Sequence, residues 1–160
     1  MPTTDVKVQS ALGSDYGPRV TALLDGAKSS VRVLMYEWKW YSHESAGGVR
    51  DFNLALVRAL RRGVKVRVIL NSEDLSHPLT RINGRTGSFL RKAGAEVKTG
   101  HLGSTTHAKV LIIDDEILVL GSHNISKSAF TRNFEASIII HSRQSILDFI
   151  RYFENIWKFA

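Results

Sequence analysis

Short aliphatic runs of strand length alternate with longer amphipathic segments along most of this 160-residue chain. Runs with apolar residues at alternating positions predict strands, and apolar residues three and four apart predict helices. The predicted strands cover residues 5–11, 31–38, 64–70, 95–99 and 134–141, with two more around a turn in residues 106–126. The predicted helices cover residues 17–30, 49–63, 88–94 and 142–159. This order predicts an α/β fold with a mixed, mostly parallel sheet and helices on both faces.

The composition is that of one soluble globular domain, which we place at residues 1–160. Hydrophobic residues make up 43% of the chain, and no apolar stretch is long enough to span a membrane. Residues 37–48 and 71–85 are predicted as long loops, which often carry function. The N-terminus lacks the pattern of a secretory signal, so we expect a cytoplasmic protein, although a mature secreted or periplasmic form would look the same.

The net charge of +7 favours a polyanionic partner, either nucleic acid or an anionic membrane surface, although many basic domains bind neither. The absence of cysteine excludes disulfides and thiolate metal sites. The spacing of histidines and acids fits no other metal site, so we expect no metal.

Residues 106–126 read THAKVLIIDDEILVLGSHNIS and place polar groups at both ends of a predicted hairpin. His107 and Lys109 share one face of the first strand because side chains alternate along a strand. If the second strand pairs back, Ser122 and Asn124 return to the same end of the sheet. An imidazole, an ammonium, a hydroxyl and a carboxamide together suit a phosphate, since they supply positive charge and hydrogen-bond donors.

The spacing HxK(x)4D(x)6GSxN resembles the signature of the phospholipase D superfamily. Its six defining positions are His107, Lys109, Asp114, Gly121, Ser122 and Asn124. The resemblance implies that superfamily's fold over nearly the whole chain. It also implies metal-independent cleavage of phosphodiesters through a phosphohistidine, without a cofactor.

The resemblance also assigns roles to single residues. His107 would attack phosphorus as the nucleophile, which divides the reaction into two displacements. Glu135, on the strand after the GSxN loop, would accept a hydrogen bond from the far ring nitrogen of His107 and fix its tautomer. Asp114 would either support the site or hold the turn, and we favour structural support over direct chemistry.

The chain carries one copy of this motif, whereas the mechanism needs a second, protonated histidine on the leaving-group side. None of the other five histidines has a lysine two positions later. We therefore expect a homodimer with a two-fold axis through the active site, as the resemblance to small single-motif nucleases implies. The alternative is that the sequence is one half of a longer chain with a second copy.

Aromatic and basic residues outside the motif are candidate substrate contacts. Trp38, Lys39 and Trp40 could stack the bases of a single strand, lie at a lipid interface, or pack beneath the loop. Arg81 and Arg85 could contact phosphates or form part of a solvated helix face.

The sequence therefore predicts an endonuclease of phospholipase D type, active on DNA or RNA. A phospholipase D-type hydrolase of phospholipid head groups is the second hypothesis, although we do not expect a membrane partner. A non-catalytic nucleic-acid-binding domain of a larger repair or defence system is the third.

Overall fold

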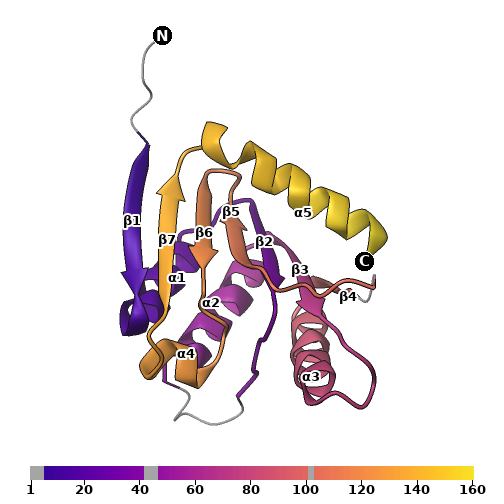
Figure 1. Cartoon of the computed structure of the whole chain (residues 1–160). Coiled ribbons are helices and arrows are strands. Elements are labelled where there is room, and N and C mark those ends of the chain that lie inside the picture. The colour runs from indigo at the N-terminus through magenta and orange to yellow at the C-terminus, as the bar shows by residue number, and fades with distance from the viewer. Residues whose placement is uncertain (1–5, 42–46, 101–102) are drawn as a thin grey trace.

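One seven-stranded mixed sheet forms the centre of the structure, and helices cover both of its faces (Figure 1). The computed structural model describes residues 6–41, 47–100 and 103–160. Its strands are β1 (Lys7–Leu12), β2 (Ser30–Met35), β3 (Lys65–Asn71), β4 (Glu96–Gly100), β5 (Lys109–Ile113), β6 (Ile117–Gly121) and β7 (Ala136–His141). Its helices are α1 (Tyr16–Asp25), α2 (Val49–Arg61), α3 (Pro78–Lys92), α4 (Lys127–Thr131) and α5 (Leu147–Phe159), with short 3-10 turns η1 (Gly13–Asp15) and η2 (Gln144–Ile146).

The predicted α/β fold with a mixed sheet is confirmed, but the expectation of a mostly parallel sheet is wrong. The strand order is β1-β7-β6-β5-β2-β3-β4. The pairings β2–β3 and β3–β4 are parallel, whereas β1–β7, β7–β6, β6–β5 and β5–β2 are antiparallel. A parallel crossover needs a dozen or more residues, and the turn between β5 and β6 is far shorter than that.

Two apolar cores lie on opposite faces of the sheet. The larger core joins the sheet to α1, α2, α3 and α4, for example through Val20 and Phe52. The smaller core lies beneath α5, which contributes Phe153. Leu111 of β5 enters the larger core and Ile112 enters the smaller one, so the strand reads as a continuous aliphatic run. Within the described part of the chain, none of the helices combines the length and apolar character that crossing a bilayer would need.

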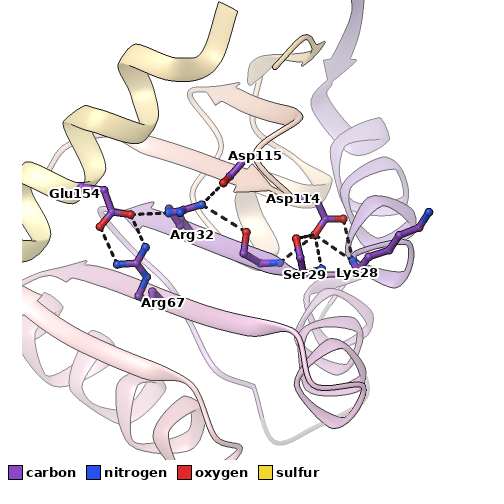
Figure 2. A network of polar contacts seen from close by, with 8 residues as sticks. Lys28, Ser29, Arg32, Arg67, Asp114, Asp115 and Glu154 are labelled. Carbon is purple, nitrogen blue, oxygen red and sulfur yellow. Dashed lines mark hydrogen bonds and ion pairs between the residues drawn. The ribbon is translucent and has the colours of Figure 1, made fainter. Parts of the chain in front are cut away.

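Ion pairs fix α5 to the sheet. Glu154 of α5 accepts hydrogen bonds from Arg67 of β3 and Arg32 of β2, and Arg32 also pairs with Asp115 in the β5–β6 turn (Figure 2). The hydrogen bond from Arg67 and that from Arg32 lower the pKa of Glu154, although partial burial raises it. The Arg67 guanidinium also lies 5.2 Å from the centre of the Trp157 ring. These contacts hold α5 in one position.

The expected loop over residues 71–85 is wrong in its second half, where α3 begins at Pro78. The Nδ1 atom of His77 accepts the backbone N–H of Leu79, and proline at the first helical position favours this start. The apolar periodicity is hidden because α3 buries Asn83 and Thr86. In the other predicted loop, residues 42–46 lie outside the described residues.

Candidate active site

Four strand termini meet at one edge of the sheet (Figure 1). Lys109 at the start of β5 pairs with Met35 at the end of β2. Gly121 at the end of β6 pairs with Ser137 at the start of β7, and β6 lies beside β5. The segments that carry the predicted site residues on either side of these termini therefore lie close together.

His107, Lys109 and Tyr36 form one contact cluster. The Nζ atom of Lys109 lies 3.4 Å from each ring nitrogen of His107 and donates to the His107 carbonyl oxygen at 2.6 Å. The ring centres of Tyr36 and His107 are 4.8 Å apart, and Lys109 Nζ lies 5.0 Å from the centre of the Tyr36 ring. The structure thus brings the imidazole and the ammonium together, with the imidazole exposed.

The electrostatics of Lys109 depend on Glu135. Burial lowers the pKa of the Lys109 ammonium, and the negative charge of Glu135 raises it in part. Glu135 therefore favours the protonated form of Lys109, which is the form that can neutralise a phosphate.

Ser122 and Glu135 form a hydrogen-bonded unit. Ser122 Oγ donates to one carboxylate oxygen of Glu135 and accepts the backbone N–H of Ala136 at 3.0 Å. Asn133 Nδ2 donates to the other carboxylate oxygen at 3.0 Å. Glycine is required at 121 for this close approach, because a Cβ there would lie 2.3 Å from the Ala136 carbonyl oxygen.

The expected hydrogen bond between Glu135 and His107 is not present among the described residues. Both carboxylate oxygens of Glu135 instead accept hydrogen bonds from Ser122 and Asn133. The physical reason is strand order: β6 lies between β5 and β7, so the two side chains start about 10 Å apart. The charge of Glu135 acts on Lys109.

Asn124 is oriented by the backbone beside it. Its Oδ1 accepts the N–H of Glu37 at 3.2 Å, so Nδ2 is the end of the amide that can donate to a ligand. Ile125 donates its N–H to the Glu37 carbonyl at 3.0 Å, and Lys39 donates its N–H to the Ile125 carbonyl at 2.8 Å. These bonds hold the segment after β6 against the segment after β2.

Two buried asparagines hold the segments on either side of this cluster. Asn83 Nδ2 donates to the carbonyls of Tyr36 and Asn71, each at 2.8 Å, and Asn83 Oδ1 accepts the Trp38 N–H at 3.0 Å. Asn71 Oδ1 accepts the Thr106 N–H at 2.7 Å. Sequence reasoning missed Tyr36 and both asparagines. A signal existed for Tyr36, which lies near the end of the predicted strand 31–38, because site residues often gather where strands end; the observed β2 ends at Met35.

His123, inside the GSxN loop, is fully buried and serves the fold. Its Nε2 donates to the Gly13 carbonyl at 2.9 Å, and its Nδ1 lies 2.8 Å from Ser137 Oγ. Burial lowers its pKa, although the Gly13 hydrogen bond and the Glu135 charge raise it in part. His77 caps α3, and His141 lies at the far end of β7. Among the described histidines, His107 alone contacts Lys109.

Asp114 lies outside the site, so its inclusion among the catalytic candidates is wrong. It follows the opposite end of β5, and five residues of strand separate it from Lys109 by about 17 Å. Its carboxylate accepts backbone N–H groups of Lys28, Ser29 and Ser30, at 2.7 to 3.1 Å (Figure 2). These contacts fit the alternative prediction, that Asp114 holds the turn.

Replacing Asp114 with alanine is expected to lower the free energy of unfolding by about 2–3 kcal/mol, because several charge-assisted hydrogen bonds are lost. The conservative Asp114→Asn change should cost about half as much, since asparagine tolerates the positive φ of 55° and keeps one acceptor. Activity per folded molecule should stay unchanged in both variants. Chemical denaturation followed by assays well below the midpoint would measure this, and a large loss of activity in folded Asp114→Asn would contradict it.

The same substitution has a predicted pH dependence. Partial burial raises the pKa of Asp114. The hydrogen bonds from the backbone N–H groups of Ser29, Ser30 and Lys28 and from the Ser29 hydroxyl lower this pKa by a larger amount, so the net shift is downward. A lowered carboxyl pKa stabilises the fold above the unfolded value of about 3.9 and ceases to do so as pH falls through the folded value. The stability gap between wild type and Asp114→Asn should therefore narrow below pH of about 4.

Trp38 cannot contact substrate as predicted, because its side chain is fully buried. Its indole N–H donates to Asn53 Oδ1 at 2.9 Å, and its carbonyl accepts the Thr86 hydroxyl. The packing alternative therefore applies to Trp38. Polar partners from two helices make burial of the indole and its backbone possible.

The other substrate-binding candidates lie in separate environments. Lys39 pairs with Glu37 at 3.0 Å, and Trp40 stacks on Phe89 with ring centres 4.9 Å apart. Arg81 and Arg85 lie one turn apart on the exposed face of α3. No contact among the described residues joins either arginine to His107, so their role in binding stays a prediction.

The exposed edge therefore presents one imidazole, one ammonium and the donor end of one amide. These groups can bind a phosphate anion and attack it. Among the described residues, no second histidine contacts His107 or Lys109. Groups of three or more histidine, aspartate or glutamate side chains suited to a metal ion are also absent from the described parts.

The chain is similar to known proteins in sequence and in fold. Residues 20–157 match the family model described as "Cardiolipin synthase, PLD-like domain". The mitochondrial cardiolipin hydrolase of Canis lupus familiaris is 33% identical over 98 residues, which are 61% of this chain and 37% of that protein. The chain thus matches well under half the length of this relative.

Two solved structures share the fold over almost their whole length. The phospholipase D family member Nuc from Salmonella typhimurium has a TM-score of 0.79 and 24% identity, over 97% of this chain and 96% of that one. NucT from Helicobacter pylori has a TM-score of 0.77 and 22% identity, over 97% and 98%. The family match covers most of the chain, the motif residues other than Asp114 lie at the strand termini described above, and the fold agrees. The chain therefore belongs to the phospholipase D-like family.

Proposed function

We propose that this protein is a metal-independent phosphodiesterase that cleaves nucleic acid as an endonuclease, through a covalent phosphohistidine on His107. The observation that carries the proposal is the contact between His107 and Lys109 at one exposed edge of the sheet, where Asn124 is bonded to the segment that follows Tyr36. An imidazole beside a positive charge supports attack on a phosphodiester, because the nucleophile and the charge that neutralises the phosphate are side by side.

Each step has a group to perform it. His107 attacks phosphorus, so that an N–P bond forms and a P–O bond breaks, while Lys109 and Asn124 Nδ2 neutralise the charge on phosphorus oxygens. A second, protonated histidine gives its proton to the departing alkoxide. That histidine, now neutral, takes a proton from water, and the resulting hydroxide displaces His107 from phosphorus. Glu135 would assist by holding Lys109 in its charged form.

The second histidine would come from another copy of the chain, across a two-fold axis at the site. An uncovered apolar surface supports this. Val8 and Leu12 of β1 and Ile138 of β7 lie on the face of the sheet that α5 covers elsewhere, and all three are exposed. Phe134, fully exposed, adjoins Glu135 at the site edge. We call Val8, Leu12, Phe134 and Ile138 the apolar patch.

Nucleic acid is favoured as substrate by charge. The chain has a net charge of +7, and Arg81 and Arg85 expose their side chains on α3.

A second candidate is hydrolysis of phospholipid head groups. It is favoured by the names of the family model and of the canine relative, both of which refer to cardiolipin. The same phosphate chemistry would serve a lipid diester, so the two candidates differ in what surrounds the phosphate.

One assay in EDTA distinguishes the nuclease from the phospholipid hydrolase. Labelled single-stranded and duplex DNA, RNA and cardiolipin vesicles are each incubated with the protein. We expect cleavage of nucleic acid in EDTA and at least a tenfold fall, roughly, in its binding between 50 and 200 mM salt, because counterions compete for phosphate contacts. Loss of all cleavage on chelation would contradict the metal-free mechanism. Release of head group with intact oligonucleotides would favour the lipid candidate.

A further inference from the structure

A cavity of about 250 Å³ opens directly beside His107, between residues 104–108, which precede β5, and helix α5. Its apolar walls are Leu34 of β2 and Ala108, with Tyr152 and Ile156 from α5. Tyr152 and Ile156 are four residues apart, so they lie on the same face of the helix. Pockets for whole drug-sized ligands have about 300–1,000 Å³, so this cavity suits one ring system rather than an entire ligand.

Apart from His107, the polar residues that line the cavity carry no charge. Residues 104–106 read Ser-Thr-Thr and contribute hydroxyl-bearing side chains to its lining. Among the described residues, His107 is the single basic or acidic side chain in this lining. A second phosphate would need cations here. The cavity therefore suits a neutral group with hydrogen-bonding edges, attached to the phosphate that His107 attacks.

The α5 side of the cavity is held in place before any ligand binds. Glu154, between the two lining residues of α5, accepts hydrogen bonds from Arg32 and Arg67 (Figure 2). Lys98 Nζ donates to the Trp157 carbonyl at 2.6 Å. Tyr152 nevertheless leaves 56% of its surface exposed, so its ring is available for stacking without disturbance of the core.

We propose that this cavity is a subsite for the nucleobase that flanks the scissile phosphate, with the Tyr152 ring as its stacking surface. The inference rests on the proposed action on nucleic acid and adds which part of the nucleotide is recognised. A base has two apolar faces and polar edges, which match an aromatic and aliphatic wall with hydroxyl groups at the rim. An acyl chain has no polar edge, so it could not form hydrogen bonds with these hydroxyl groups.

The experiment measures kcat/KM on oligonucleotides of one sequence, intact or with a single abasic residue moved stepwise past the cleavage position. Wild type, Tyr152→Ala and Tyr152→Phe are compared, and Phe159→Ala, an exposed aromatic of α5 outside the cavity, is the control. Tyr152→Ala should lose about tenfold on intact substrate, the size of one base–aromatic stack. Tyr152→Phe should keep the activity of wild type because it keeps the ring, and Phe159→Ala should also match wild type.

The decisive result is the coupling between protein and substrate changes. An abasic residue beside the scissile phosphate should cost wild type about tenfold and cost Tyr152→Ala nothing more. Independent losses, or a fully active Tyr152→Ala, would overturn the subsite while leaving nuclease activity in place. Failure of wild type to cleave any oligonucleotide, with release of head group from vesicles, would overturn the proposed substrate and the subsite together.

Discussion

Replacing His107 with alanine is expected to lower turnover of nucleic acid by about 10⁴-fold or more, because the nucleophile that divides the reaction into two displacements is removed. Substrate binding should change little, since Lys109 and Asn124 still contact the phosphate. Stability should also persist, because the imidazole is exposed and its ring neighbours are Tyr36 and Lys109. Single-turnover kinetics and a binding isotherm would separate these effects.

Two controls make this result specific to His107. His141→Ala removes a histidine at the far end of β7 and should leave turnover within about twofold of wild type. A rapid quench with substrate labelled on the phosphate that is cleaved should leave label on wild type and none on His107→Ala. Turnover by His107→Ala at the wild-type rate would refute the nucleophile assignment. Label on His107→Ala would place the covalent bond on another residue.

Much of the fold could be predicted because its strands carry continuous or alternating aliphatic residues. The hairpin of β5 and β6 is an example: its two aliphatic runs and the Asp-Asp-Glu turn place His107 and Asn124 at the same edge. Gly121 belongs to the same pattern, since the chain approaches β7 too closely there for any side chain. The local sequence is therefore enough to predict the position of a side chain when a single hairpin determines that position.

The predictions for residues 71–85 and for Trp38 are wrong because polar side chains are buried in this part of the fold. Asn83 and Thr86 are buried, so the helix around them has the composition of a loop. The same two residues bind the backbone of Trp38, which makes an aromatic residue in a polar segment part of the core. Periodicity of apolar residues cannot show this, because hydrogen bonds rather than hydrophobicity stabilise the contact.

The position of Asp114 is set by its spacing from Lys109, and the hydrogen-bond partners of Glu135 are set by strand order. The five-residue step from Lys109 to Asp114 already spans about 17 Å in a strand, so the separation of Asp114 from the site could have been predicted. The partner of Glu135 could not, because it depends on β6 lying between β5 and β7. Strand order is set by contacts distant in sequence, and one chain without related sequences does not show them.

Introducing aspartate at Ile138 or Leu12 in the apolar patch is expected to convert a homodimer into monomers and to lower activity by about 10³-fold. Burying an unpaired carboxylate in an interface costs several kcal/mol, whereas each site exposed in the monomer tolerates the charge. Sedimentation and turnover, measured at the same concentrations, would test this. Leu75→Asp, at an exposed apolar residue elsewhere, should stay dimeric and active.

Mixing chains tests whether the site itself is shared. If both copies of His107 serve one site, a dimer with one His107→Ala chain is inactive, so after exchange activity follows the square of the wild-type fraction. An equal mixture should retain about a quarter of the activity of the same total of wild type, against about a half for independent sites. The square law would tie loss of activity in Ile138→Asp to loss of the second histidine. A linear law, or full activity in a monomer, would show that each chain works alone and that the acid lies elsewhere.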